Sequence, residues 1–329
     1  MTVCCLFLYL SCIPFGFLIY YKGLFCEEEY MNKQSRDEKS KFTIERIVLF
    51  IVVIVISILV VETVISYHWI KVNEYSVSAK EIQSPVRLVV ISDLHAHKFG
   101  SDNGKLVDKV KDQEPDVILM CGDFLNEDSD NHTEVIKLIE KFKNIAPVYF
   151  ALGNHELGYI ENGHEEFLED LETAGAVVLD KTYKDITVGK THIRLGGLYD
   201  YAFALDGNDD AKNTPEPVKS FLLEYQETQS YKIMMSHRPD SFIFGNASEY
   251  WDVDLVISGH NHGGQVVVPF LGGLFGGDQG LFPKYIHGMY DVGAMKLFAT
   301  SGLSSERQML PRWNNRPEIA MIELSAEDN

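Results

Sequence analysis

Residues 86–95 read VRLVVISDLH, an apolar run that ends directly in a polar Asp-Leu-His cluster. The same order recurs at residues 117–123, VILMCGD, and at residues 148–156, VYFALGNHE. Short, continuous apolar runs are typical of strands that are buried on both faces. The three stretches therefore predict strands of one sheet, each followed by chemically active side chains.

An amphipathic stretch lies between two of these predicted strands. Val135, Leu138 and Phe142 belong to a set of apolar residues spaced as one face of a helix. Alternating strands and helices predict an α/β fold, in which crossover helices cover the sheet. Ligands of such sheets bind at the carboxyl ends of the strands, where each polar cluster is expected to lie.

The second half of the chain is richer in predicted strands. A hairpin and four strands are expected at residues 185–195, 232–235, 253–258, 296–299 and 318–324. The second of these leads to His237, and the third leads to Gly-His-Asn-His at residues 259–262. The polar clusters thus continue in the same position, directly after apolar strands.

Side chains able to bind metal ions occur in five such clusters. They are Asp93, His95, Asp123, Asn154, His155, His237, His260 and His262. Imidazole combined with carboxylate suits manganese, iron or zinc, whereas calcium or magnesium favours an all-oxygen set. Taken singly the clusters have ordinary explanations, since Gly-Asp is common turn chemistry and one histidine can belong to a core. Their ordered recurrence, with more donors than one ion uses, instead indicates two metal ions that act on a phosphoryl group.

The order Asp-x-His, Gly-Asp, Gly-Asn-His-Glu, His and Gly-His-x-His resembles the pattern of the calcineurin-like metallophosphoesterases. Residues 92–100, 259–265 and 316–324 are also similar to a membrane-associated bacterial branch that includes lipid-headgroup pyrophosphohydrolases. The resemblance covers nearly all of the chain after residue 86 and implies a four-layer αββα sandwich of two mixed sheets. In some relatives an arginine follows the last motif, but residues 266–268 are valines here.

The resemblance also implies a role for each residue of the motifs. Seven side chains would bind two metal ions: Asp93, His95 and His262 one ion, Asn154, His237 and His260 the other, with Asp123 bridging. His155 would be the general acid or charge stabiliser beside the departing oxygen, and Glu156 would orient it.

The implied activity is hydrolysis of a phosphate ester or pyrophosphate bond by a hydroxide that bridges two divalent ions (Mn, Fe or Zn). The substrate would be a phosphorylated small molecule or a lipid-linked headgroup. One alternative is a cytoplasm-facing hydrolase of nucleotides or nucleotide sugars, and another is a metal-stabilised binding module without turnover. The complete ligand set and His155 favour an enzyme.

Two apolar segments precede this region. Residues 3–21 are uncharged and residues 47–69 carry only Glu62, so each is long enough to cross about 30 Å of hydrocarbon as a helix. The six basic residues of the first seventy all lie in 22–46, which predicts a cytoplasmic connection and an extracytoplasmic domain at residues 86–329 of a cell-membrane protein. A cleaved signal peptide, or a peripheral segment beside a single span at 47–69, are the alternatives for the first segment. Residues 71–85 are expected to be a polar juxtamembrane spacer.

Residues 269–283 contain two glycine pairs between two prolines and predict a flexible loop. Its apolar side chains are Phe270, Leu271, Leu274, Phe275, Leu281 and Phe282. They are expected either to contact lipid or an acyl chain, or to pack against the domain as a lid.

The charge balance excludes a nucleic-acid binder that works through bulk positive charge. The 329 residues include 48 acidic and 29 basic side chains, and residues 71–329 hold 41 of the acidic and 23 of the basic ones. A hydrophobic content of 46% also excludes a disordered chain. Cys121 is the only cysteine after residue 26, and its apolar surroundings predict a buried, unreactive thiol.

Overall fold

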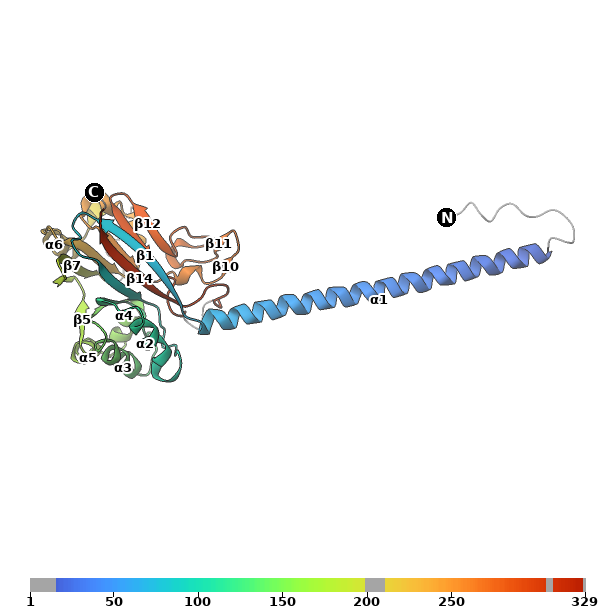
Figure 1. The fold of residues 1–329 in the computed structure, drawn as a ribbon, viewed down its shortest axis with the longest axis horizontal. Coiled ribbons are helices and arrows are strands. Elements are labelled where there is room, and N and C mark those ends of the chain that lie inside the picture. Colours follow the sequence, from blue (N-terminus) through green and yellow to red (C-terminus); the bar gives the residue numbers. More distant parts are fainter. Residues whose placement is uncertain (1–15, 199–210, 306–309, 328–329) are drawn as a thin grey trace. The chain divides into compact units, whose positions relative to one another are not determined.

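The computed structural model describes residues 16–198, 211–305 and 310–327 (Figure 1). The chain divides into two compact units, Met1–Val60 and Val61–Asn329. The described part of the first unit is helical and belongs to helix α1, whose last turns lie in the second unit.

Helix α1 spans Gly16–His68 without interruption. Residues 22–46, which were expected to connect two membrane spans, are therefore helical rather than a loop. The physical reason is that no proline occurs between Pro14 and Pro85, and that segment is rich in helix-forming Glu and Lys. Among the described residues, Lys41–His68 is long and apolar enough to cross a membrane. Most of the expected 3–21 span lies outside the described residues, so a two-span topology stays a prediction.

Two six-stranded mixed sheets form the centre of the second unit. The first has the order β1 (Lys71–Ala79), β14 (Glu318–Ala326), β2 (Val86–Ile91), β3 (Val117–Cys121), β4 (Val148–Ala151) and β5 (Ala176–Leu179). The second has the order β12 (Gly288–Val292), β13 (Met295–Ala299), β9 (Leu255–Ser258), β8 (Tyr231–Ser236), β7 (Thr191–Leu198) and β6 (Thr182–Val188). Strands β2 to β5 are parallel, as are β7, β8, β9 and β13, so their carboxyl ends share one edge in each sheet.

Helices cover the outer face of each sheet, and apolar side chains fill the space between the sheets. In β2, Leu88 and Val90 pack in the cluster between the sheets, whereas Val89 and Ile91 pack in the cluster beneath the helices. The first sheet is covered by α2 (Gly104–Lys111), α3 (Thr133–Phe142), α4 (Asn154–Glu161) and α5 (Phe167–Ala174). The second is covered by α6 (Val218–Tyr225), α7 (Asp240–Phe244) and α8 (Ala247–Tyr250). The result is the four-layer sandwich that the resemblance implies.

The expected spacer at residues 71–85 is mostly a strand. Strand β1 pairs in parallel with β14, from Lys71 opposite Glu318 to Ala79 opposite Ala326. As an edge strand it exposes or half-exposes all its side chains except Val77, so its sequence lacks the apolar run that marks the central strands. The remaining predicted strands are present within a few residues of their expected bounds.

A small hairpin occupies the expected flexible loop. It consists of β10 (Val267–Val268) and β11 (Gly272–Gly273), which are antiparallel, and a 3₁₀ turn follows at Gly277–Gln279. Three further 3₁₀ turns lie at Ser101–Asn103, Ala211–Asn213 and His262–Gly264.

Candidate metal centre

The predicted ligands lie where the carboxyl ends of the two sheets meet. Asp93 and His95 follow β2, Asp123 follows β3, and Asn154 begins α4 directly after β4. His237 follows β8, while His260 and His262 follow β9 of the other sheet. The arrangement of parallel strands therefore brings residues from five distant segments to one place.

Distances between the side chains show that the aspartates and histidines form one cluster. Ligand atoms within each of three trios lie within 4.8 Å of one another: Asp93, His95 and His262; His95, Asp123 and His155; and Asp123, His237 and His260. Asp123 Oδ2 lies 2.9 Å from His237 Nε2 and 3.9 Å from His95 Nε2. Asp123 thus lies between the two halves of the cluster.

Several of these residues have a left-handed backbone. The φ angles are 56° at Asp93, 58° at Asp123 and 69° at His260, and they are also positive at His95 and His262. Residues other than glycine adopt this region rarely, and such strain is concentrated at functional sites. Local hydrogen bonds hold the turns, since the N–H groups of Asp93 and His95 donate to the carbonyls of Gly122 and Asp123.

The strand-end turn before Asp123 requires glycine. Gly122 has a φ of 78°, and a Cβ at this position would lie 2.5 Å from Nδ1 of His237. The small residue therefore permits both the turn and the close approach of the histidine ring.

Hydrogen bonds on the far side of three histidine rings orient them. Nδ1 of His237 donates to the carbonyl of Cys121 at 2.8 Å, and Nδ1 of His262 donates to the carbonyl of Ser304 at 3.1 Å. In His95, Nδ1 lies 2.8 Å from Oδ1 of Asn126. In a neutral ring each of these contacts leaves the lone pair of Nε2 available, which is the arrangement that a metal-binding histidine needs.

Three polar atoms of the predicted ligands are buried without a hydrogen-bond partner. They are Asp93 Oδ2, His95 Nε2 and Asn154 Oδ1. A buried polar atom without a partner costs about 1–3 kcal/mol, so three together need compensation. A set of nitrogen and oxygen donors of this kind fits divalent ions of the manganese, iron and zinc type.

The protonation states suit cation binding. Burial lowers the pKa of His95 to about 4 and that of His262 well below its ordinary value, so both rings are neutral near pH 7. Burial raises the pKa of Asp93 to about 6. Burial also opposes the charges of Asp123 and His237, but their mutual attraction holds the pKa of Asp123 well below its usual range and raises that of His237 to about 10. The centre of the site therefore favours positive charge beside Asp123.

His155 belongs to the cluster but has a different environment from the seven expected ligands. Its Nδ1 accepts a hydrogen bond from the N–H of Glu127 at 3.3 Å, so in the neutral ring Nε2 carries the proton. This Nε2 lies 4.0 Å from Oδ2 of Asp123. The ring therefore presents a proton donor toward the site.

Glu156 contacts the backbone of the turn that carries Asp123. Its side chain is fully buried and accepts hydrogen bonds from the N–H groups of Asp123, Phe124 and Gly153 at 2.7–2.8 Å. It therefore links this turn to the start of α4 and positions Asp123 directly.

Two supporting residues were not found from the sequence. Asn126 orients His95, and the fully buried Arg312 donates to the carbonyls of Ser301 and Ser304 at 2.9 and 2.8 Å. Burial lowers the pKa of Arg312 to about 10, which still leaves it charged near pH 7. Neither residue follows an apolar run or belongs to a spaced motif, so no sequence pattern marks them. Cys121 is buried and free, as expected.

The chain is similar to several known proteins. A family model described as calcineurin-like phosphoesterase matches residues 86–264. An uncharacterized metallophosphoesterase of Campylobacter jejuni is 28% identical, over 70% of this chain and 57% of that protein. The phosphodiesterase YaeI of Escherichia coli is also 28% identical, over 74% of this chain and 84% of that protein. A solved structure, phosphopantetheinyl hydrolase from Mycobacterium tuberculosis, aligns with 67% of this chain and 91% of its own, with 12% identity and a TM-score of 0.41.

The family model matches more than half of the chain, so the chain belongs to the calcineurin-like phosphoesterases. This match confirms the family predicted from the sequence motifs. The chain spans little more than half the length of the Campylobacter relative.

Proposed function

We propose that the chain is a membrane-anchored phosphoesterase with a two-metal centre. In this proposal Asp93, His95 and His262 bind one divalent ion, Asn154, His237 and His260 bind the other, and Asp123 bridges them. The observation that carries the proposal is the convergence of carboxylate and histidine donors from both sheets on one place, with buried atoms of Asp93 and His95 left without a partner. When bound, two divalent ions such as Mn²⁺ supply Lewis acidity toward a phosphoryl oxygen and toward water.

The chain's own residues complete the chemistry. His155 is the charge stabiliser beside the departing oxygen, because its Nε2–H faces the site and would donate a hydrogen bond to the charge that develops on that oxygen. Glu156 keeps Asp123 in place through three backbone hydrogen bonds. The Asn126 and Cys121 contacts hold the rings of His95 and His237 in the orientation for metal binding.

Activity can be tested on the full chain in mild detergent, with bis-p-nitrophenyl phosphate as substrate and added Mn²⁺. We expect Asp123→Asn to abolish metal binding and turnover together. We expect His155→Ala to keep the metals and to lower the rate by about 10²–10⁴-fold. His192→Ala is the matched control, because His192 is exposed on β7. If His155→Ala were as active as the His192→Ala control, its role beside the departing oxygen would be wrong.

We also propose that the substrate is a phosphate ester or pyrophosphate outside the cytoplasm. This class of substrates includes lipid-linked headgroups. The support is Lys41–His68, a segment that can cross a membrane, together with the basic residues that precede it. A reporter that works only in the cytoplasm, fused after residue 329, should be inactive. An active reporter would reverse the orientation and favour nucleotide or nucleotide-sugar substrates.

The substrate class itself needs a second experiment. The full chain is incubated with membrane lipid extract and with nucleotide sugars, and the compound that loses phosphate is identified.

A further inference from the structure

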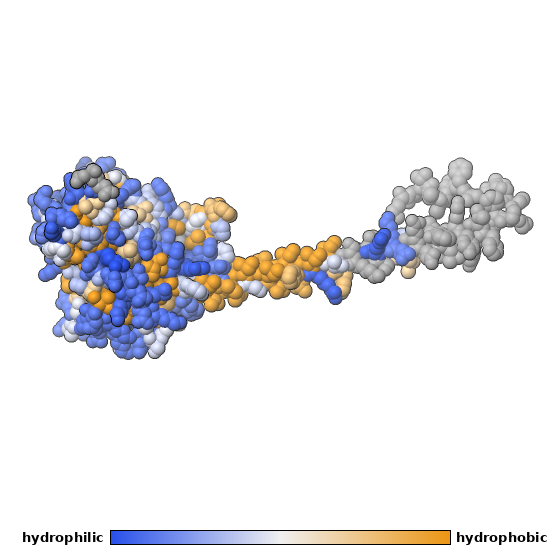
Figure 2. Space-filling model, viewed as in Figure 1, coloured by the Kyte–Doolittle hydropathy of each residue, from blue (hydrophilic) through white to orange (hydrophobic). Residues whose placement is uncertain are grey.

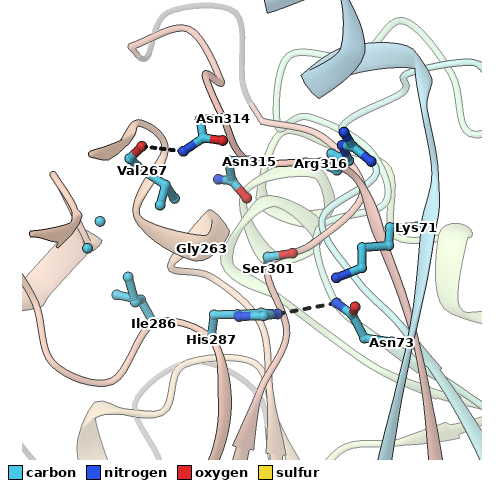
Figure 3. Close-up of a pocket in the computed structure, with 12 residues that line it drawn as sticks. Lys71, Asn73, Gly263, Val267, Ile286, His287, Ser301, Asn314, Asn315 and Arg316 are labelled. Atoms are coloured by element: carbon cyan, nitrogen blue, oxygen red, sulfur yellow. Dashed lines mark hydrogen bonds between the residues drawn. The ribbon is translucent and has the colours of Figure 1, made fainter. Parts of the chain in front are cut away.

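A second concave site of the domain is a pocket of about 480 Å³ beside strand β1, which we call the β1 pocket (Figure 3). Lys71, His287 and Arg316 supply basic side chains to its lining, and Asn73, Ser301 and Asn314 supply polar ones. None of the seven proposed metal ligands lines it. Its volume is in the range of sites for small molecules.

The charge of the β1 pocket is opposite to that of its domain. Residues 71–329 have many more acidic than basic side chains, but no described residue that lines the pocket is acidic. Glu318 is fully buried, and its Oε1 accepts hydrogen bonds from Asn73 and Tyr75 and lies 2.9 Å from Nε2 of His287. Burial opposes the charge of His287, but Glu318 raises its pKa. His287 therefore balances Glu318, and Lys71 and Arg316 leave the pocket positively charged.

An exposed apolar patch borders the pocket. Val267, Gly272 and Gly273 of the β10–β11 hairpin line the pocket, and the turn of this hairpin carries Phe270 and Leu271, which are 107% and 68% exposed. Leu281 and Phe282 of the following loop are 69% and 56% exposed. The expectation that this loop packs against the domain as a lid is therefore wrong for these four side chains. Figure 2 shows apolar colouring on the projecting surface beside β10 and β11. Contiguous exposed apolar side chains mark sites of interaction with proteins or membranes.

One segment, residues 312–316, joins the pocket, the hairpin and the end of α1. Asn314 donates from Nδ2 to the carbonyl of Val267 at 2.9 Å, and Arg316 lines the pocket. The N–H of Asn315 donates to Oγ of Ser66 at 3.1 Å, and the N–H of Arg312 donates to the hydroxyl of Tyr67 at 3.2 Å. Ser66 and Tyr67 lie in the last turn of the segment that can cross a membrane. The pocket and the apolar patch are therefore attached to the point where that segment ends.

We infer that the β1 pocket binds the phosphate headgroup of an anionic phospholipid, while Phe270, Leu271, Leu281 and Phe282 enter the surrounding acyl region. Ammonium and guanidinium groups are suited to a phosphate, and each basic side chain at an anionic membrane surface strengthens binding about fivefold. The bound lipid is not the reacting group, because the pocket contains none of the proposed metal ligands. The inference rests on the membrane anchoring in the proposed function. A soluble anion cannot account for the apolar patch beside the pocket.

Native mass spectrometry of the full chain in detergent tests the inference, with phosphatidylglycerol and phosphatidylcholine as probes. We expect the parent to retain phosphatidylglycerol in preference to phosphatidylcholine. Lys71→Gln/Arg316→Gln should weaken that retention about 25-fold, and each single variant about fivefold. Lys184→Gln/Lys190→Gln is the matched control, because it removes two exposed charges elsewhere on the domain. Equal retention by the pocket variant and the control would overturn the inference.

The apolar patch and the source of the phosphate need separate variants and probes. Phe270→Ser/Leu271→Ser should weaken retention of phosphatidylglycerol about tenfold. Glycerol phosphate and inorganic phosphate, at the same concentration as the lipid, should not displace it. If either did so, the pocket would be a site for soluble anions and the inference would be wrong. Manganese-dependent turnover by the parent is measured separately, so failure of the proposed function is distinguishable from failure of lipid retention.

Discussion

Replacing Glu156 by Gln tests how the position of Asp123 is maintained. The two side chains have the same shape, but Gln has one accepting oxygen and one donating NH₂ group. In the parent, Oε2 accepts from the N–H groups of Asp123 and Gly153, while Oε1 accepts from the N–H of Phe124. If the oxygen of Gln takes the place of Oε2, the amide NH₂ faces the N–H of Phe124 and that hydrogen bond is lost.

The expected cost follows from these contacts. A hydrogen bond to a charged acceptor contributes about 1.5–3 kcal/mol, and the buried N–H left without a partner costs about 1–3 kcal/mol. These two contributions overlap, because both describe the same broken contact. We therefore expect Glu156→Gln to lower the free energy of unfolding by about 3 kcal/mol. The looser turn should also weaken Mn²⁺ binding about 10–100-fold, as loss of a supporting contact does at other metal sites.

Urea unfolding of the full chain in detergent, followed by tryptophan fluorescence, measures the stability change. The half-buried Trp313 and the buried Trp251 report on the domain itself. Glu172→Gln is the matched control, because Glu172 is exposed on α5. If Glu156→Gln unfolded at the same urea concentration as this control, the three hydrogen bonds would not hold the turn, and the reasoning would be refuted.

Three further perturbations have defined outcomes. Gly122→Ala should lower the free energy of unfolding by about 2 kcal/mol or more and weaken Mn²⁺ binding, because the new Cβ meets the His237 ring in a left-handed turn. Calorimetric titration with Mn²⁺ measures the affinity, and Gly163→Ala is the control because Gly163 is a left-handed glycine with open space around it. Equal Mn²⁺ affinities of the two variants would show that the crowding is unimportant. Arg312→Met should lower the free energy of unfolding, measured by urea titration, by about 3–5 kcal/mol, because it leaves several buried carbonyls without donors. A loss below about 1 kcal/mol would contradict this role of Arg312. Because Glu318 raises the pKa of His287, that pair stabilises the fold fully below the ordinary pKa of 6.5 and less as the pH rises through the raised value. The Tm advantage of the parent over His287→Gln should therefore shrink as the pH is raised from about 6, and a constant or growing advantage would contradict it.

The sequence was sufficient to predict the central strands and the positions of the clustered residues. Strands β2, β3 and β4 are buried on both faces apart from the half-buried Arg87, so their sequences are nearly continuous apolar runs, and the polar residues that end them stand out. The edge strand β1 was missed because pairing with β14, rather than burial, makes it a strand. Edge pairing leaves only a weak pattern in the sequence.

The supporting contacts of the site were harder to predict. The resemblance implied that Glu156 orients the ring of His155. The hydrogen bonds of Glu156 cross to the turn after β3, which is brought close only by the pairing of β3 with β4. Arg312 likewise acts through carbonyls of residues 262 and 301–304, which only the complete fold brings together.

The most direct test of the account is a calorimetric titration of the chelator-treated full chain with Mn²⁺. We predict binding of two Mn²⁺ ions per parent chain, because Asp123 lies between two separate sets of donors. We predict that Asp123→Asn loses high-affinity binding of both ions, while His192→Ala binds as the parent does. A parent chain that binds no Mn²⁺, Fe²⁺ or Zn²⁺, or an Asp123→Asn variant that binds them as tightly as the parent, would contradict the two-metal centre.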